Sequence, residues 1–157
     1  MSHPQLRAFV LIGIVFAGGC YGGGKPAEYP LKAPAILTLT EPVVTGAFIV
    51  EPRTFKPFKI TIGDGMTNPR LEGTFTASGA RNDIEVTLLD ETQFANWQNR
   101  QKFEAAYVSG RVTSGKISVN LPAARGTYFV VFSNRFSIIS NKAVTADVQL
   151  RYDRTQS

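Results

Sequence analysis

The chain has 157 residues, of which 43% are hydrophobic and 18% are charged, so its length suits one domain with a single buried core. Cys20 is the one cysteine, which excludes an intramolecular disulfide framework and a zinc site built from several thiolates. The net charge of +5 favours anionic surfaces such as lipid headgroups or wall polymers, but it is too diffuse to indicate nucleic acid.

Residues 1–19 have the three-part plan of a secretory signal peptide. Arg7 supplies a positive charge, an apolar run follows at residues 8–16, and small residues end the segment. The run is shorter than the ~20 apolar residues that a permanent membrane-spanning helix needs. We therefore predict that residues 1–19 direct export and are removed.

The residues directly before Cys20 are small, namely Ala17, Gly18 and Gly19. This run resembles the lipobox of bacterial lipoproteins, in which the cysteine thiol is diacylglycerated and the chain is then cut so that the cysteine comes first. The family prefers Leu where Ala17 stands and Ala, Ser or Thr where Gly18 stands. The resemblance implies that Cys20 carries fatty acids such as palmitate and anchors the protein to a membrane of the cell envelope, facing outside the cytoplasm.

Two other outcomes fit the same segment: a conventional signal cut that leaves Cys20 as a free thiol, and an uncleaved amphiphilic anchor. Lipidation accounts for the lone cysteine, because a secreted protein would otherwise expose a reactive thiol. Acyl chains contribute about 0.8 kcal/mol per buried methylene, so two or three of them hold a protein stably on a membrane. By resemblance to known sorting patterns, Tyr21 favours the outer membrane in a cell that has two. Residues 20–34 are rich in Gly and Pro and are predicted to form a flexible tether.

From Ala35 onward, short apolar segments are separated by Gly, Pro, Asn and Asp at spacings typical of a β-sandwich. Residues 71–77 and 117–121 alternate between apolar and polar side chains, as in strands with one buried face. Residues 128–132 are all apolar, as in a central strand covered on both faces. Hairpin turns are predicted at residues 63–65 and 114–115, where glycine permits positive backbone angles. The predicted strands span residues 36–40, 43–50, 55–62, 71–77, 84–89, 106–112, 116–121, 127–132 and 144–151.

Residues 90–100 interrupt this pattern and predict a short helix. Asp90 is suited to the N-cap, and Phe94 and Trp97 lie three residues apart on one helical face. We expect Trp97 to close one end of the sandwich; the alternative is an exposed platform on which a sugar stacks. The predicted fold is therefore an all-β antiparallel β-sandwich over residues 35–157, of jelly-roll or Ig-like type, with one short helical insertion.

Three segments of the domain carry a family resemblance. They read LEGTFTASG at residues 71–79, NDIEVTLLD at residues 82–90, and GTYFVVFSN at residues 126–134, with KAV following at residues 142–144. Together they resemble a recurrent bacterial β-sandwich module of unassigned activity, similar in turn to the Golgi-dynamics (GOLD) domains of eukaryotic cargo receptors. The resemblance implies a sandwich with an adhesive or adaptor use. It does not imply cargo transport, because those receptors continue into a coiled coil and a membrane helix.

The sequence favours a protein that is not an enzyme. His3 is the one histidine and lies in the predicted signal peptide, so the mature protein lacks the usual general base of hydrolases and the commonest zinc ligand. Asp83 and Glu85 lie two apart on a predicted strand, so both are expected on its solvent face. The sequence has neither the spacing of known calcium loops nor a phosphate-binding loop. We predict no catalytic residue, no metal site and no cofactor.

One loop is a candidate for contact with a partner, because Asn134, Arg135 and Phe136 place a cation and an aromatic ring at its tip. Alternatively, Phe136 and Ile138 fold back onto the sandwich while asparagines form its turns. The predicted function is that of a lipid-anchored, non-enzymatic sandwich presenting a protein- or glycan-binding surface in the cell envelope. The alternatives are a structural envelope protein that acts by self-assembly or strand pairing and, third, a secreted enzyme that depends on carboxylates.

Overall fold

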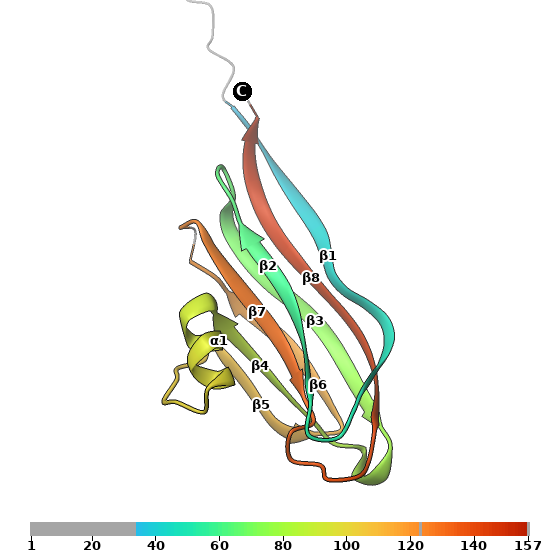
Figure 1. The fold of residues 1–157 in the computed structure, drawn as a ribbon. Helices are drawn as coiled ribbons and strands as arrows, with labels where there is room; N and C mark the ends of the chain where they lie inside the picture. Colours follow the sequence, from blue (N-terminus) through green and yellow to red (C-terminus); the bar gives the residue numbers. More distant parts are fainter. Residues whose placement is uncertain (1–33, 123, 157) are drawn as a thin grey trace, which may run out of the picture. The chain divides into compact units, whose positions relative to one another are not determined.

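The structure is a computed structural model that describes residues 34–122 and 124–156. The signal peptide, Cys20 and almost all of the tether predicted above lie outside the described residues. The strands are β1 (Ala35–Val50), β2 (Phe55–Ile62), β3 (Thr67–Ser78), β4 (Ile84–Asp90), β5 (Tyr107–Val112), β6 (Ser114–Asn120), β7 (Gly126–Ser133) and β8 (Lys142–Gln156). They form two four-stranded antiparallel sheets, with the orders β1-β8-β3-β6 and β2-β7-β4-β5 (Figure 1).

Successive strands alternate between the two sheets, except that β4 and β5 pair with each other in one sheet. Eight strands in this order form a jelly roll, whereas Ig domains arrange seven or nine strands differently. The prediction of an all-β antiparallel sandwich is therefore confirmed, and the strand order decides between its two suggested types.

The core lies between the sheets and follows from the period-two alternation of side chains along each strand. Along β8, every second side chain from residue 142 to residue 152 is buried. Phe132 of β7 makes edge-to-face contacts with Phe48, Phe58 and Phe75, at ring-centroid distances of 5.1 Å, 5.9 Å and 5.9 Å. These rings join strands of both sheets into one apolar core.

The outer face of the β2-β7-β4-β5 sheet is also covered, because α1 (Glu91–Gln98) packs against it. Trp97 is 9% exposed and contacts Leu89 of β4 and Val131 of β7. The expectation that Trp97 closes one end of the sandwich is therefore wrong, and its burial also excludes the sugar platform. Asp90 is the N-cap as predicted, since its carboxylate accepts from the Gln93 backbone N–H at 2.7 Å.

The continuous apolar sequence of β7 is explained by this double cover. Its alternate residues Val130 and Phe132 face the inter-sheet core, while Phe129 and Val131 face α1. The prediction of a central strand covered on both faces is confirmed, since β7 lies between β2 and β4.

Two predictions about the backbone are wrong. The segments expected as separate strands before Phe55 form one strand, β1, whose register against β8 shifts between Pro42 and Val44. Gly115 does not form a hairpin turn but lies within β6, where the ring of Phe75 occupies the space that a Cβ would need. Residues 63–65 do contain a turn, although it connects strands of different sheets.

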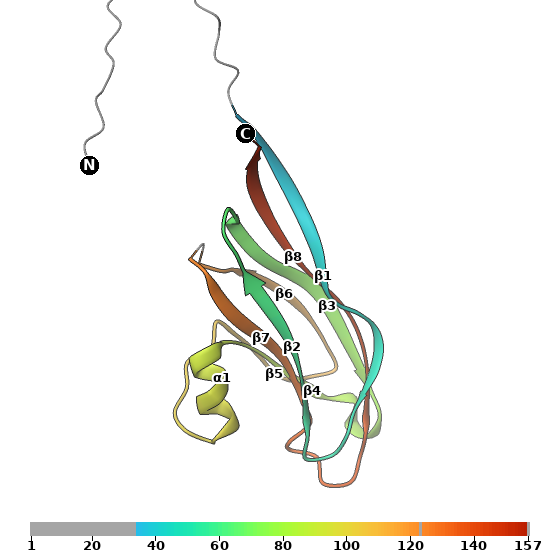
Figure 2. The same cartoon turned by 45° about the horizontal axis from the view of Figure 1, so that its top comes forward.

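The two ends of the sandwich differ. At one end β1 begins and β8 ends, and both strands extend past the other strands (Figures 1 and 2). At the opposite end, which we call the loop end, the chain passes from β1 to β2, from β3 to β4, from β5 to β6 and from β7 to β8 (Figure 1). A 3-10 turn, η1 (Ala80–Asn82), lies in the β3–β4 connection there.

Candidate binding site

A hollow of about 450 Å³ lies at the loop end, between the β7–β8 loop and η1. We call it the end-loop hollow. It combines cationic, hydroxyl and apolar side chains from three segments of the chain. Its lining residues are Ala80, Arg81, Asp83, Arg111, Phe136, Ser137, Ile138, Ile139, Ser140 and Lys142.

The rim of the hollow carries two adjacent exposed isoleucines. Ile138 is 68% exposed and Ile139 is 87% exposed, so Ile138 does not fold back onto the sandwich as the alternative interpretation expected. Phe136 is half-buried, and the guanidinium carbon of Arg111 lies 4.2 Å from its ring centroid. One face of this ring is thus occupied by a cation, which leaves the isoleucines as the apolar surface open to a partner.

The floor of the hollow contains a buried ion pair. Lys142 projects inward from the start of β8, and its Nζ lies 2.5 Å from Oδ1 of Asp83. The same ammonium group donates to the carbonyl oxygen of Ala80 in η1. Because Asp83 neutralises one cation, Arg81 and Arg111 leave the hollow with an excess of positive charge. The arrangement suits an anionic group next to apolar atoms.

Asn134, the first residue of the predicted partner loop, has a structural role. It is fully buried, and its side-chain amide donates to the carbonyl oxygens of Val50, Glu51 and Ser140 at 3.1 Å, 3.2 Å and 2.8 Å. These bonds fasten the β7–β8 loop to the end of β1. The turn role that the sequence suggested as an alternative fits this geometry, whereas a partner cannot reach the side chain.

Arg135 is directed away from the hollow. Its guanidinium carbon lies 4.1 Å from the ring centroid of Trp97 and 4.7 Å from that of Phe55, and it donates to the carbonyl oxygens of Trp97 and Gln98. Burial lowers the pKa of Arg135, and the nearby charge of Arg100 lowers it further. Of the three predicted loop residues, only Phe136 lines the hollow.

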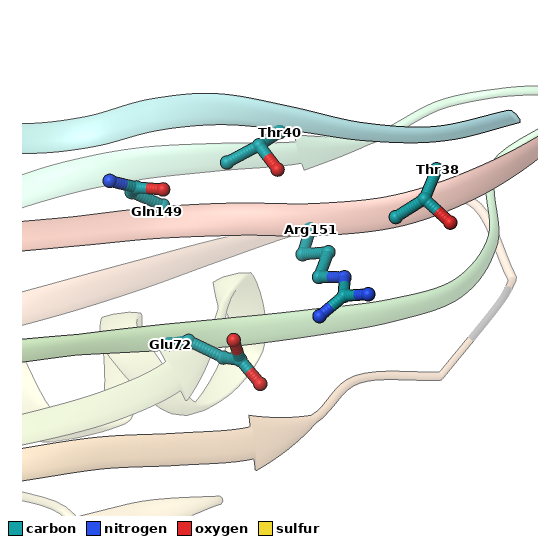
Figure 3. A pocket seen from close by; sticks show the side chains of 5 residues that line it. All are labelled: Thr38, Thr40, Glu72, Gln149 and Arg151. Atoms are coloured by element: carbon teal, nitrogen blue, oxygen red, sulfur yellow. The ribbon is translucent and has the colours of Figure 1, made fainter.

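A second hollow, of about 310 Å³, lies on the outer face of the β1-β8-β3-β6 sheet (Figure 3). Its side chains are all polar and come from three adjacent strands, which Figure 3 shows side by side. They are Thr38, Thr40, Glu72, Gln149 and Arg151. Because this surface offers hydrogen bonds and charges without an apolar anchor, the end-loop hollow is the better candidate for a specific partner.

The described residues contain no group of three or more His, Cys, Asp and Glu side chains placed to hold a metal ion. Of the two carboxylates considered in the sequence analysis, Asp83 and Glu85, the first forms an ion pair with Lys142. Among the helical residues that the structure describes, none belongs to a helix long and apolar enough to cross a bilayer.

Comparison of the chain with known protein families finds no family model that matches, and comparison with curated proteins finds no match either. A jelly roll serves many unrelated functions, so the fold alone assigns none. The geometry of the end-loop hollow is therefore the basis for a functional proposal.

Proposed function

We propose that the chain is a lipid-anchored, non-enzymatic protein of the cell envelope that binds an acidic protein partner in the end-loop hollow. The observation that carries the proposal is the pair of exposed isoleucines, Ile138 and Ile139, beside the cations Arg81 and Arg111. Large aliphatic side chains exposed together next to positive charge fit a partner that offers both an apolar side chain and a carboxylate.

A protein partner fits this surface better than a glycan. Glycan-binding sites commonly use an open aromatic face on which the sugar ring stacks. Here Trp97 is buried, and Arg111 occupies a face of Phe136. Aliphatic side chains in a cationic setting instead match the apolar and charged contacts that anchor protein interfaces.

The position of the hollow agrees with anchoring through Cys20. The described chain enters the sandwich at Ala35, at the end opposite the hollow (Figure 1). A lipid on Cys20 and a tether up to residue 34 would attach the sandwich by that end. The hollow would then lie at the end of the sandwich farthest from the attachment point, where a partner in the envelope can reach it.

Two experiments test the two parts of the proposal. The first labels cells with a fatty acid and fractionates their membranes, comparing the parent with Cys20→Ser. Label and membrane association in the parent, both lost in the variant, support the anchor; an unlabelled, processed and soluble parent overturns it.

The second experiment places a photo-crosslinking amino acid at Ile139 and, as a control, at Val108, which is 53% exposed on β5. In intact cells, we expect a discrete protein adduct from position 139 that is absent from position 108. The adduct should weaken when Arg81 and Arg111 are replaced by Glu. An adduct to a glycan, or equal adducts from both positions, contradicts an acidic protein partner.

A further inference from the structure

The edge of β1 is an open surface of a different kind. Within the described residues, β1 pairs with β8 on one side, and its other side has no strand partner. The backbone N–H and C=O groups along such an edge can pair with a further strand. The sandwich has three other sheet edges, formed by β6, β2 and β5.

These three edges carry features that oppose pairing with another strand. β2 has two lysines and a proline, β6 has a lysine, and β5 is short and contains Gly110 and Arg111. The second half of β1 is protected as well, by Pro42, by the register shift that follows it, and by Gly46 with a φ of 98°.

The first six residues of β1 lack every one of these features. Residues 35–40 read AILTLT, without a charge, a proline or a glycine, and five of them are β-branched or leucine residues of the kind that fills strands. Ile36 is 70% exposed and Leu37 is 45% exposed. The first residues of this segment lie where β1 and β8 extend past the other strands (Figure 2), whereas β3 lies on the far side of β8 from Asp153, the partner of Thr38, onward. The free side of β1 faces away from both β8 and β3.

We propose that residues 36–40 of β1 pair with the same residues of a second copy of the chain, antiparallel and related by a two-fold axis. In such an interface equivalent residues lie close together, so any charge on the strand would repel its own copy. Residues 35–40 are uncharged, and β2, β5 and β6 each contain cations. The absence of charge on residues 35–40 therefore favours this edge for pairing with the same edge of a second copy.

The register is set by the two faces of the strand. Thr38 and Thr40 lie on the outer face of the sheet, and Leu37 and Leu39 lie on the opposite face. A two-fold axis at Thr38 places Thr38 opposite its copy and Leu37 opposite Leu39, and it keeps each side chain on its own face. A shift by one residue would place leucines opposite threonines.

The pairing also avoids a clash between the two sandwiches. Because the paired strands run in opposite directions, the remainder of each β1 leads its sandwich away from the other. The contact is short, so we expect a weak dimer in solution that forms more readily where copies are held together on a surface. This inference does not depend on the end-loop hollow, and it extends the alternative of strand pairing to defined residues.

The test uses the full chain in mild detergent, with the dimer measured by sedimentation over a range of concentrations. Thr38→Lys places two like charges opposite each other at the axis, and we expect it to weaken dimerisation by roughly ten-fold or more. Thr76→Lys is the matched control, because Thr76 is an exposed threonine of β3 in the interior of the same sheet. It should leave the dimer unchanged.

Disulfide trapping provides a second readout that does not depend on the stability of a charged variant. Under mild oxidation Thr38→Cys should form a cross-linked dimer more extensively than Thr76→Cys, and the parent measures any contribution from Cys20. A parent that stays monomeric overturns the proposal, and so does equal trapping at positions 38 and 76. A dimer that persists in Thr38→Lys, or a partner other than a second copy trapped at residue 38, overturns it as well.

Discussion

The Nζ atom of Lys142 lies 2.5 Å from Oδ1 of Asp83, with 2% of the lysine side chain and 19% of the aspartate side chain exposed. We predict that Asp83→Ala lowers the free energy of unfolding by about 3–5 kcal/mol, because it leaves a buried ammonium group without its counter-charge. Lys142→Met should lower the free energy of unfolding by less, because the remaining Asp83 carboxylate is nearer to water and methionine fills much of the volume of the lysine side chain.

Urea unfolding of both variants and of the double variant measures this difference. If the two partners act as a pair, the double variant loses less free energy of unfolding than the two single variants lose in total. Equal losses in the single variants, with simple additivity in the double variant, would falsify the role given to the buried ammonium group.

The side-chain amide of Asn134 is the next target, because it is a donor to three carbonyl oxygens at the loop end. Asn134→Ala removes these bonds and should destabilise the fold by about 1–3 kcal/mol. Asn134→Asp should be worse at neutral pH, since a carboxylate would face the same carbonyl oxygens. Thermal unfolding at neutral and acidic pH compares the two. An Asn134→Asp variant that is as stable as the parent would contradict the structural role. Ile139→Ser is the control, because Ile139 is exposed, and it should change stability by less than about 0.5 kcal/mol.

The sequence was sufficient to predict the fold class and most strand positions, because these depend on local patterns. β2 occupies the residues at which it was predicted, and the alternation along β8 marks its buried face. The pairing of strands was beyond such reasoning. Thr38 and Asp153 are partners in the register of β1 and β8 although they lie at opposite ends of the domain sequence. Only the three-dimensional structure brings such segments together.

The site was harder to predict because its residues come from separate segments. Phe136 was named, but the cations Arg81 and Arg111 were not assigned to this site. Lys142 was also missed, since lysine is rarely buried. A signal was nevertheless present: Lys142 lies two residues before Val144, so the alternation of β8 places it on the inward face.

Two glycines are predicted to be irreplaceable for reasons of space. A Cβ on Gly115 would lie 2.5 Å from Cζ of the buried Phe75 ring, and a Cβ on Gly73 would overlap the backbone carbonyl of Asp147. We expect Gly115→Ala to lower the free energy of unfolding by about 1–3 kcal/mol. Gly73→Ala should cost more, because a backbone obstacle cannot rotate away. Gly63→Ala is the control, since no atom lies within 4 Å of its Cβ position. Denaturant unfolding should show no loss there; losses of equal size at all three positions would contradict the steric explanation.

The contact of Arg135 with Trp97 predicts that this arginine cannot be replaced by lysine. Its planar group lies over the indole ring and donates to two carbonyl oxygens at the end of α1, which a lysine ammonium group cannot reproduce together. Arg135→Lys should therefore lose most of the stability that Arg135→Ala loses. Tryptophan fluorescence during unfolding reports on both variants, because Trp97 is the one tryptophan. Full retention of stability in Arg135→Lys would show that charge alone suffices.

The hydroxyl of Tyr152 donates to Oε1 of Glu41 at 2.5 Å, which joins β8 to β1. This hydrogen bond, together with burial and the charge of Glu41, raises the pKa of Tyr152 above its ordinary value of 10.0. The folded state thus keeps the phenol proton more tightly than the unfolded chain does. Its contribution to stability is fully present below about pH 10 and is lost as the pH rises through the folded pKa.

We accordingly expect the free energy of unfolding to fall above about pH 10, and to fall less steeply in Tyr152→Phe, which cannot ionise. Burial also raises the pKa values of Tyr107 and Tyr128, so part of the decline should remain in that variant. Urea unfolding at pH 8 to 11 measures both slopes, with Tyr107→Phe as a comparison that leaves the Glu41 contact intact. Parallel slopes for the parent and Tyr152→Phe would mean that the contact with Glu41 does not hold the phenol proton.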